Sequence, residues 1–343
     1  MKRVLYIGIN TYGSTSAMRA NKMKEILNGW EMDIIDTDIP YNTGNHILKS
    51  LAFRYKIGPL IKRINNYIVA HLSKEHYDLI WVDKAIFITP KTTKMLRERA
   101  DVLVHYTPDP AFTYHQSKIF YESMPLYDFM ITTKTYEVAD YIRIMNDQEK
   151  VLYVTQGFDK KVHRPLTPLF EKRGVAFIGR HEIEREAPIL ILIKAGIDVY
   201  LAGGKWRNFA IKHNCPNLHY IGDNLNGDDY VKALSSCLFA LGAVSKWIPE
   251  KHTTRTFEIP ACKTALLTER NDEIEEFYTD SEVIYYKNTE EILSKVQYYL
   301  SHKSELYELI ENGYNRVQTG GFDFESIMKS LLKKVLNLSD DLS

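Results

Sequence analysis

The sequence predicts an α/β protein with two Rossmann-like lobes, and three observations support this fold class. Short apolar runs alternate with longer helical patterns from end to end, which is typical of parallel sheets covered by helices. Two prolines, Pro165 and Pro168, interrupt any continuing element between two sets of about six such runs. A length of 343 residues also suits two domains, each with a core of its own.

The apolar runs define the expected strands. In the first lobe they cover residues 3–9, 32–36, 78–83, 102–106, 129–132 and 151–155. In the second lobe they cover residues 174–178, 198–202, 218–221, 238–241, 265–268 and 283–286. A final helix is expected at 322–338, where apolar residues recur on one face. We therefore expect domains at 1–165 and 166–320, followed by a helical segment at 321–343.

The overall composition excludes several classes of protein. Lysine and arginine number 44 and are balanced by 44 acidic residues, so a nucleic-acid binder, which normally has a strongly basic face, is not expected. The first apolar run is too short for a signal peptide, and no run approaches the length of a membrane span. Cys215, Cys237 and Cys262 are odd in number and widely spaced, which suggests neither disulfides nor a zinc site. A cytoplasmic protein is expected.

The segment 49–71 combines several basic residues with large apolar ones. Such a segment could lie on an anionic membrane that carries a lipid-linked acceptor. It could equally be a surface helix packed on its own sheet, which is the commoner case. Both interpretations stay open, so the expected location is cytoplasmic with an optional peripheral contact at the inner face of the membrane.

The segment 250–258 contains the strongest functional signal. Pro260 has no N–H to donate, so we expect it in the first turn of a helix that begins at about 257–259. Glu258 would then lie at a helix N-terminus, where free N–H groups attract a diphosphate and a carboxylate can accept both hydroxyls of a ribose. Arg255 adds a fork of donors just before that turn. The alternative is an ordinary helix start with a solvated glutamate.

Other candidates in the second lobe follow its expected strands, because ligands bind beyond the carboxyl ends of parallel strands. The interpretation of Arg185 stays open, since it could instead pair with Glu182 or Glu186 on a solvated helix face. Glycines at these positions let the backbone approach a ligand, and cations suit a diphosphate. The candidates are Gly179, Arg180, Arg185, Gly204, Lys205, Tyr220 and Lys246.

In the first lobe, the loop 8–16 lacks the spacing of a dinucleotide site. We expect its Gly13 and Ser14 to serve mainly as a turn and a helix cap, with acceptor binding as a secondary role. Asp109 follows the fourth strand and could act as a general base toward an acceptor hydroxyl, orient that hydroxyl, or simply form a turn before Pro110. Lys84 and His105 are further acceptor-side candidates.

Asp36 and Asp38 match the D-x-D pattern of metal-dependent glycosyltransferases, but they lie in the lobe without nucleotide features. No His, Cys and carboxylate cluster in the sequence has metal-ligand spacing. We therefore expect no metal and no cofactor.

Two resemblances give these residues a context. Glu250 and Glu258 resemble the E-x7-E motif of the group 1 glycosyltransferases, whose second glutamate holds the ribose. The surrounding sequence resembles the C-terminal module of the spore-maturation CgeB-like glycosyltransferases, and the similarity covers about 174–300. Lys263 stands where those sequences usually carry glycine. The motifs are RTFEIPACKTALLTE at 255–269, EIEEF at 273–277 and VIYYKNTEEI at 283–292.

The resemblance implies a GT-B fold, with two Rossmann-like lobes facing a cleft and a C-terminal helix crossing back to the first lobe. It implies a glycosyltransferase of hexosyl type that uses a UDP- or GDP-linked sugar, retains the anomeric configuration and acts on a glycan, protein or lipid-linked acceptor. Glu250 would contact the sugar, Glu258 the ribose, and Arg180 the departing diphosphate. A nucleotide-sugar epimerase of the same fold and a non-catalytic nucleotide-sugar-binding module are the alternatives.

Overall fold

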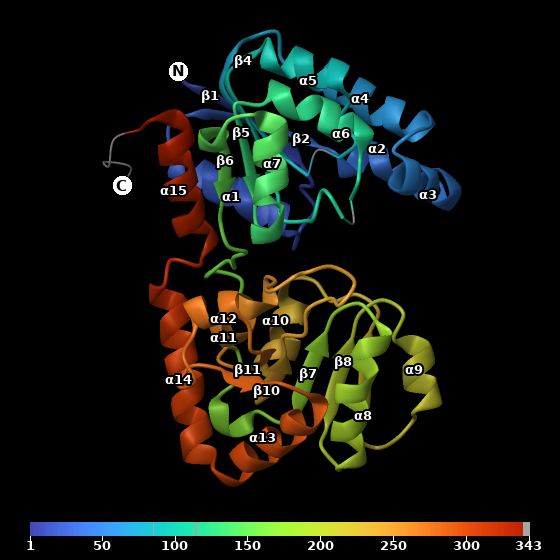
Figure 1. The fold of residues 1–343 in the computed structure, drawn as a ribbon, viewed down its shortest axis with the longest axis vertical. Coiled ribbons are helices and arrows are strands. Elements are labelled where there is room, and N and C mark those ends of the chain that lie inside the picture. The colour runs from blue at the N-terminus through green and yellow to red at the C-terminus, as the bar shows by residue number, and fades with distance from the viewer. Residues whose placement is uncertain (85, 114, 339–343) are drawn as a thin grey trace. The chain divides into compact units, whose positions relative to one another are not determined.

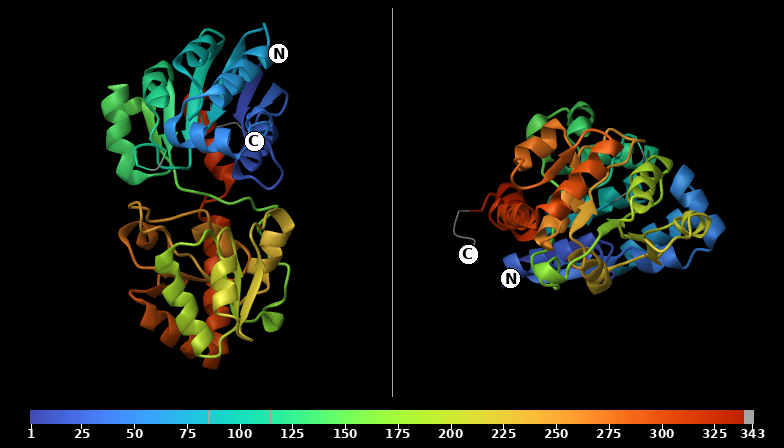
Figure 2. Two further views of the ribbon diagram at one scale, coloured as in Figure 1. Left: turned by 90° about the vertical axis from the view of Figure 1, so that its right-hand side faces the viewer. Right: turned by 90° about the horizontal axis from the view of Figure 1, so that it is seen from below.

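The computed structural model describes residues 1–84, 86–113 and 115–338, and the chain divides into two compact units. The first unit combines Met1–Thr155 with Phe324–Ser343, and the second is Gln156–Asp323. The chain passes between the units twice, in green at 155–156 and in red at 323–324 (Figure 2). Residues 339–343 of the expected terminal segment lie outside the described residues.

The first unit ends earlier than the boundary expected at residue 165. After β6, the backbone N–H of Gln156 donates to His252 Nε2 at 3.1 Å, and that of Phe158 donates to the Phe322 carbonyl at 3.3 Å. These bonds attach the connecting segment to the second unit already at Gln156 and Phe158. Pro165 and Pro168 therefore lie in a loop of the second unit rather than between the units.

Both units consist of parallel strands joined by helices, and each of the twelve expected strands is present (Figure 1). The first unit contains β1 (Arg3–Gly8), α1 (Thr15–Ile26), β2 (Glu31–Asp36), α2 (Asp38–Asn42), α3 (His46–Tyr55), α4 (Pro59–His71), β3 (Tyr77–Asp83), α5 (Pro90–Arg97), β4 (Ala100–Thr107), α6 (Lys118–Ser123), β5 (Phe129–Thr132), α7 (Val138–Met145), β6 (Val151–Tyr153) and α15 (Phe324–Leu336). The second contains β7 (Val175–Ile178), α8 (Glu186–Lys194), β8 (Val199–Ala202), α9 (Arg207–Lys212), β9 (Leu218–Gly222), α10 (Gly227–Ser235), β10 (Phe239–Leu241), α11 (Arg255–Ala261), β11 (Ala265–Glu269), α12 (Asp272–Phe277), β12 (Ile284–Tyr286), α13 (Thr289–Ser301) and α14 (Lys303–Thr319).

The first sheet has the strand order β2-β1-β3-β4-β5-β6, and helices cover both of its faces. Alternate strand residues point to opposite faces, which divides the core into two clusters. Leu5 and Ile7 of β1 pack in the cluster that includes α3 to α7, whereas Val4 and Tyr6 pack in the cluster with α1 and α15. Figure 1 shows α15 beside α1, as expected for a C-terminal helix that returns to the first lobe.

A buried ion pair joins α1 to the end of β3. Arg19 donates to both carboxylate oxygens of Asp83, at 2.9 and 3.1 Å, and both side chains are fully buried. The Tyr6 hydroxyl adds a third hydrogen bond to Asp83, at 2.8 Å. Removing one partner of such a pair leaves an uncompensated buried charge, which is costly. The pair therefore holds the position from which Lys84 leaves the strand.

The second sheet has the strand order β12-β11-β10-β7-β8-β9 and is again covered on both faces. One face packs against α8, α9 and α13, and the other against α10, α11 and α12. From β7 the chain adds β8 and β9 on one side and then returns to add β10 on the other. This reversal creates a topological switch point between β7 and β10, where ligands of open α/β sheets bind.

Candidate functional site

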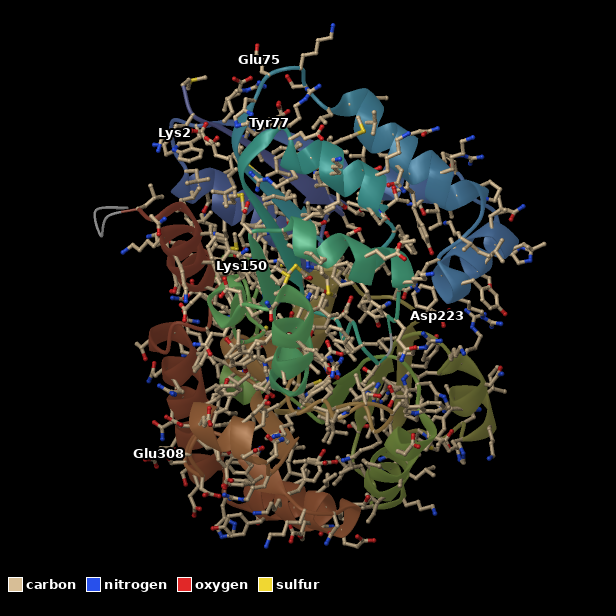
Figure 3. All side chains as sticks on the ribbon, turned by 45° about the horizontal axis from the view of Figure 1, so that its top comes forward. Lys2, Glu75, Tyr77, Lys150, Asp223 and Glu308 are labelled. Carbon is tan, nitrogen blue, oxygen red and sulfur yellow. The ribbon has the colours of Figure 1, made fainter. Side chains whose placement is uncertain are left out.

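A cavity of about 490 Å³ opens at the carboxyl edge of the second sheet. Arg180 and Lys205 are exposed there, and among the described residues neither side chain has an ion-pair partner. Asp223, which follows β9, is labelled in Figure 3. The cavity is lined by Ile178, Gly179, Arg180, Gly203, Gly204, Lys205, Asp223, Asn224 and Leu225. Four of the residues expected from the sequence, Gly179, Arg180, Gly204 and Lys205, are thus brought together.

Two glycine-bearing strand ends touch beside this cavity. Gly203 has a φ of +128°, and a Cβ atom built on it would lie 2.0 Å from the carbonyl oxygen of Gly179. A side chain at Gly203 would therefore displace the backbone that follows β7. Trp206 Nε1 donates to the same Gly179 oxygen at 2.8 Å, and this hydrogen bond holds the backbone that follows β7 in place. The glycines are needed for this close approach of backbones.

Arg255 bridges the two strands of the switch point. Its guanidinium donates to the carbonyl oxygen of Ile178, the last residue of β7, at 3.4 Å and to that of Ala243, which follows β10, at 3.1 Å. A Cβ on Gly179 would lie 3.1 Å from Arg255 Nη1, so the glycine also makes room for this side chain. The Arg255 Nε atom is buried without a hydrogen-bond partner among the described residues.

Arg185 is a second arginine at this point, and it is buried whereas Arg255 is partly buried. Arg185 donates to the Arg180 carbonyl at 2.8 Å and pairs with Glu182 at 3.2 Å, and its Nε atom also lacks a partner among the described residues. Burial lowers the pKa of Arg185, and the nearby charge of Arg255 lowers it further. Two adjacent guanidinium groups with unused donors form a set that a bound anion would complete.

The helix carrying Glu258 begins earlier than expected. It starts at Arg255, so Pro260 lies inside the helix and the predicted start at 257–259 was wrong. An interior proline leaves the carbonyl four residues before it without its usual donor. Here that carbonyl belongs to Thr256, and the Tyr278 hydroxyl donates to it at 2.9 Å. A tertiary contact therefore replaces the missing bond and makes the proline tolerable.

Glu258 is nearly buried and does not line the cavity. Its Oε2 accepts a hydrogen bond from the Tyr230 hydroxyl at 2.5 Å, and its Oε1 lies 3.5 Å from His163 Nε2. Sequence analysis missed both neighbours, because they come from distant segments. After the helix, Lys263 has a φ of +53°, a left-handed conformation that favours glycine, which explains the glycine usual at this place in similar sequences.

The remaining donor-side candidates are dispersed. Lys246 is half exposed and forms an ion pair with Glu269. Tyr220 donates to Asp223 at 2.5 Å and lines a separate surface pocket with Arg207. Glu250 is partly buried, and its charge favours the protonated form of Arg185.

A second pocket, of about 220 Å³, lies at the carboxyl edge of the first sheet. Lys84 Nζ and Asp109 Oδ2 form an ion pair of 2.9 Å there, and His115 Nε2 lies 3.7 Å from the same oxygen. Burial by itself would raise the pKa of Asp109, but Lys84 and His115 hold it below its usual value. The lining residues are Ile9, Thr37, Asp38, Tyr41, Phe53, Lys84, Ile86, Phe87, Thr107, Asp109 and His115.

The other first-lobe candidates have structural positions. His105 is fully buried in the middle of β4, where its ring packs 4.5 Å from that of Phe120, and burial lowers its pKa to about 3. It faces the core rather than the pocket, because β4 is covered on both sides. Gly13 has a φ of +81°, and Ser14 caps α1 by accepting from the Ala17 N–H at 3.1 Å. His115, not His105, is the pocket histidine, and its distance from any strand end hid it in the sequence.

The D-x-D carboxylates are occupied by the loop after β1. Asp36 accepts backbone N–H groups from Asn10 and Asp38, and Asp38 accepts the Thr11 hydroxyl at 2.9 Å. Within the described ranges, no group of three or more His, Cys, Asp or Glu residues is arranged to hold a metal ion. No helix of the described part of the chain has the length and hydropathy needed to cross a membrane.

Comparison with solved structures decides the fold. Sucrose-phosphate synthase from Thermosynechococcus elongatus superposes with a TM-score of 0.70 at 15% identity, over 96% of this chain and 97% of that one. This chain has the GT-B fold. Residues 185–333 also match the family model described as glycosyl transferase-like, and most of the matched segment lies in the second unit of this GT-B protein.

Two further solved structures are similar over almost the whole chain. HepE from Anabaena, in complex with UDP-glucose, gives a TM-score of 0.65 at 12% identity over 98% of this chain and all of that one. The trehalose 6-phosphate synthase from Burkholderia multivorans gives 0.66 at 12% identity, over 98% and 99% of the two chains. No curated protein matches the chain in sequence.

Proposed function

We propose that this protein is a glycosyltransferase that moves a sugar from a nucleotide diphosphate sugar to a hydroxyl group of an acceptor. The observation that carries the proposal is the cationic, glycine-lined cavity at the switch point of the second sheet. Arg180 and Lys205 are exposed in it, and its wall residues Gly179 and Arg180 are contacted by Arg255 and Arg185, each of which has a buried Nε without a partner among the described residues. The glycosyltransferase-like domain includes Arg185 and Arg255, and HepE, with the same fold, binds UDP-glucose.

In the proposed reaction, the acceptor hydroxyl oxygen forms a bond to the anomeric carbon while the bond from that carbon to the diphosphate breaks. The hydroxyl proton passes to the Asp109 carboxylate or to the departing diphosphate. Negative charge develops on the departing diphosphate, and preorganised cations stabilise such charge in a site shielded from water. We assign this role to Arg180 and Lys205, which are exposed in the cavity. We further propose, from the resemblance to the CgeB-like and group 1 enzymes, a hexosyl donor, retention of configuration and a sugar contact from Glu250.

UDP binding tests the donor site directly. We expect wild-type protein to bind UDP, and Arg180→Ala to weaken that binding at least about tenfold, since a charged hydrogen bond contributes about 1.5–3 kcal/mol. Arg173 is the matched control, because it is exposed just before β7 whereas Arg180 is exposed just after it. Isothermal titration calorimetry measures both. Absence of binding to both UDP and GDP would overturn the proposal.

Transfer should proceed without a metal ion, because arginines rather than a metal handle the leaving group and the Asp36 and Asp38 carboxylates are occupied by the neighbouring loop. We expect the rate of transfer from the best-bound nucleotide sugar to persist in EDTA. Loss of activity with the chelator, reversed by Mn²⁺ or Mg²⁺, would contradict this. Proton NMR of the product linkage would show whether the configuration is retained.

Glu258 is proposed to hold the ribose. Glu258→Gln should then keep the fold and weaken UDP binding by about 1–3 kcal/mol through loss of charged hydrogen bonds. Tyr230→Phe is the control, because it removes the hydroxyl that now bonds to Glu258 and leaves the carboxylate in place. Calorimetry should show a clear loss of affinity for Glu258→Gln and little change for Tyr230→Phe. Equal UDP affinity in wild type and Glu258→Gln would end the ribose role.

We also propose peripheral contact with an anionic membrane through α3 and α4. Ile47, Tyr55 and Ile57 are each more than half exposed there, and Arg54 and Lys62 are exposed beside them. Apolar insertion with basic neighbours is the usual basis of such binding. We expect the protein to sediment with phosphatidylglycerol vesicles. The bound fraction should fall as the salt concentration rises, and it should be lower for Ile57→Glu than for wild type. No difference from pure phosphatidylcholine vesicles would contradict the contact.

A further inference from the structure

We infer that the acceptor is a neutral sugar, and that the 220 Å³ pocket of the first unit holds its ring. This inference rests on the proposed function, because it names the acceptor class of the same reaction. The relevant observations all lie within the first unit. They are the position of the pocket in the sheet, the aromatic side chains in its wall, and the balance of charges in its lining.

The pocket lies at the switch point of the first sheet. The chain adds β2 on one side of β1 and then β3 on the other, so the crossover connections diverge between β1 and β3. The pairing register places the carboxyl ends of the strands β2, β1, β3 and β4 level with one another. Each of these four strands contributes to the pocket a residue at its end or directly after it: Ile9, Thr37, Lys84 and Thr107.

Aromatic rings form part of the wall. Tyr41 and Phe87 stack with centroids 5.7 Å apart and an interplanar angle of 14°, and Phe53 meets His115 edge-on at 5.4 Å. These three aromatic residues are only partly buried. The buried Lys56 places its ammonium group 4.8 Å from the Phe53 ring centroid and 5.9 Å from that of Phe87, which fixes both rings. Aromatic faces carry partial negative charge, which suits the C–H groups on one face of a pyranose ring.

The polar part of the wall suits hydroxyl groups. Among the described lining residues, Asp38 and Asp109 provide two carboxylates and Lys84 provides one ammonium group, and the ammonium group of Lys56 beside the Phe53 and Phe87 rings balances the second carboxylate. Burial lowers the pKa of His115, which keeps its imidazole neutral near pH 7 although Asp109 opposes the shift. Ionised carboxylates accept hydrogen bonds from hydroxyls and repel phosphates. The lining therefore favours a neutral, hydroxyl-rich ligand over a phosphorylated one.

The size of the pocket points to the same class. A volume of 220 Å³ equals that of about seven water molecules at roughly 30 Å³ each, and it falls below the usual range for drug-sized ligands. One six-membered ring with its hydroxyls fills such a space. The combination of one stacked face and hydroxyl acceptors distinguishes a sugar from a serine or threonine side chain, which offers a single hydroxyl and no ring.

Saturation-transfer NMR with methyl glycosides of the common hexoses tests the inference without any donor. We expect at least one glycoside to bind, with the strongest transfer to the C–H protons of one ring face. Binding should weaken at least about tenfold in Tyr41→Ala and in Phe53→Ala, and it should persist in Tyr41→Phe, which keeps the aromatic face. Tyr55→Ala is the matched control, because Tyr55 is exposed on α3 outside the pocket.

The result is separable from that of the donor test. Calorimetry with UDP on the same samples reports on the second unit. If the proposed function is wrong, the protein will not bind UDP, whether or not it binds a glycoside. The inference is overturned if no hexoside binds to protein that binds UDP. It is equally overturned if binding survives both alanine variants, or if Tyr55→Ala reduces it as much as they do.

Discussion

Replacing Asp109 by asparagine should slow glycosyl transfer by about 100-fold or more while UDP affinity stays nearly unchanged. The carboxylate lies in the 220 Å³ pocket of the first unit, ion-paired with Lys84 at 2.9 Å, and in the proposed reaction a group that accepts a proton or orients the acceptor acts on the chemical step. Asp101→Asn is the matched control, because Asp101 is exposed at the opposite end of the same strand β4. Initial rates at saturating donor, with calorimetry on UDP, measure both effects.

The pKa of Asp109 predicts the pH dependence of this step. Lys84 and His115 hold the pKa below the usual value near 3.8, so the carboxylate remains ionised down to acid pH. Its contribution to transfer, and to stability through the ion pair, is therefore present above the unfolded pKa and lost only as pH falls through the lowered folded pKa. We expect no decline from this group between pH 8 and pH 5. If Asp109→Asn transferred sugar at a near-normal rate, Asp109 would have only a structural role in the turn before Pro110.

Arg255→Ala should lower UDP affinity by about 100-fold and should also destabilise the protein by about 1–3 kcal/mol. The guanidinium donates to the carbonyls at the end of β7 and after β10, so its removal leaves Ile178 and Ala243 without these donors. Its buried Nε, which has no partner among the described residues, would lose the contact proposed with the diphosphate. Urea denaturation and calorimetry with UDP separate the two effects.

Arg316→Ala is the control that distinguishes packing from binding. Arg316 is also partly buried, and its Nε donates to the Phe277 carbonyl at 2.7 Å in the same unit. Neither arginine lines the cavity of the second unit itself, but Arg255 lies against its wall residue Gly179, whereas Arg316 bonds to Phe277. We expect Arg316→Ala to lose stability with UDP affinity retained. A loss of stability without a loss of affinity in Arg255→Ala would assign that arginine to loop support alone.

The strands were predictable because their signal is local. Apolar runs such as 78–83 and 129–132 recur wherever a strand is buried on both faces, so the strands in the structure differ from the expected ones only at their ends. Helix α11 was harder, because the position of Pro260 depends on Tyr278. The local rule places proline in a first turn, whereas a distant hydroxyl supplies the donor that makes an interior position tolerable.

The cavity of the second unit was partly predictable for the same reason. Gly179, Arg180, Gly204 and Lys205 follow strands directly, and strand ends of a parallel sheet meet at one edge. Tyr220 does not follow this rule, because it lies inside the edge strand β9, and its side chain lines a separate pocket. Position after a strand therefore predicts the edge of the sheet but not the side chains that share one cavity.

By itself, the sequence determined the α/β class, the twelve strands and the loops that carry glycine and cations, because periodicity and backbone conformation depend on neighbouring residues. Only the tertiary structure decided which side chains meet. Glu258 is surrounded by Tyr230 and His163, and Asp109 shares its pocket with His115 and Tyr41, all from segments that no spacing rule connects. Strand order brings these segments together, since crossover connections place ends that are distant in sequence side by side.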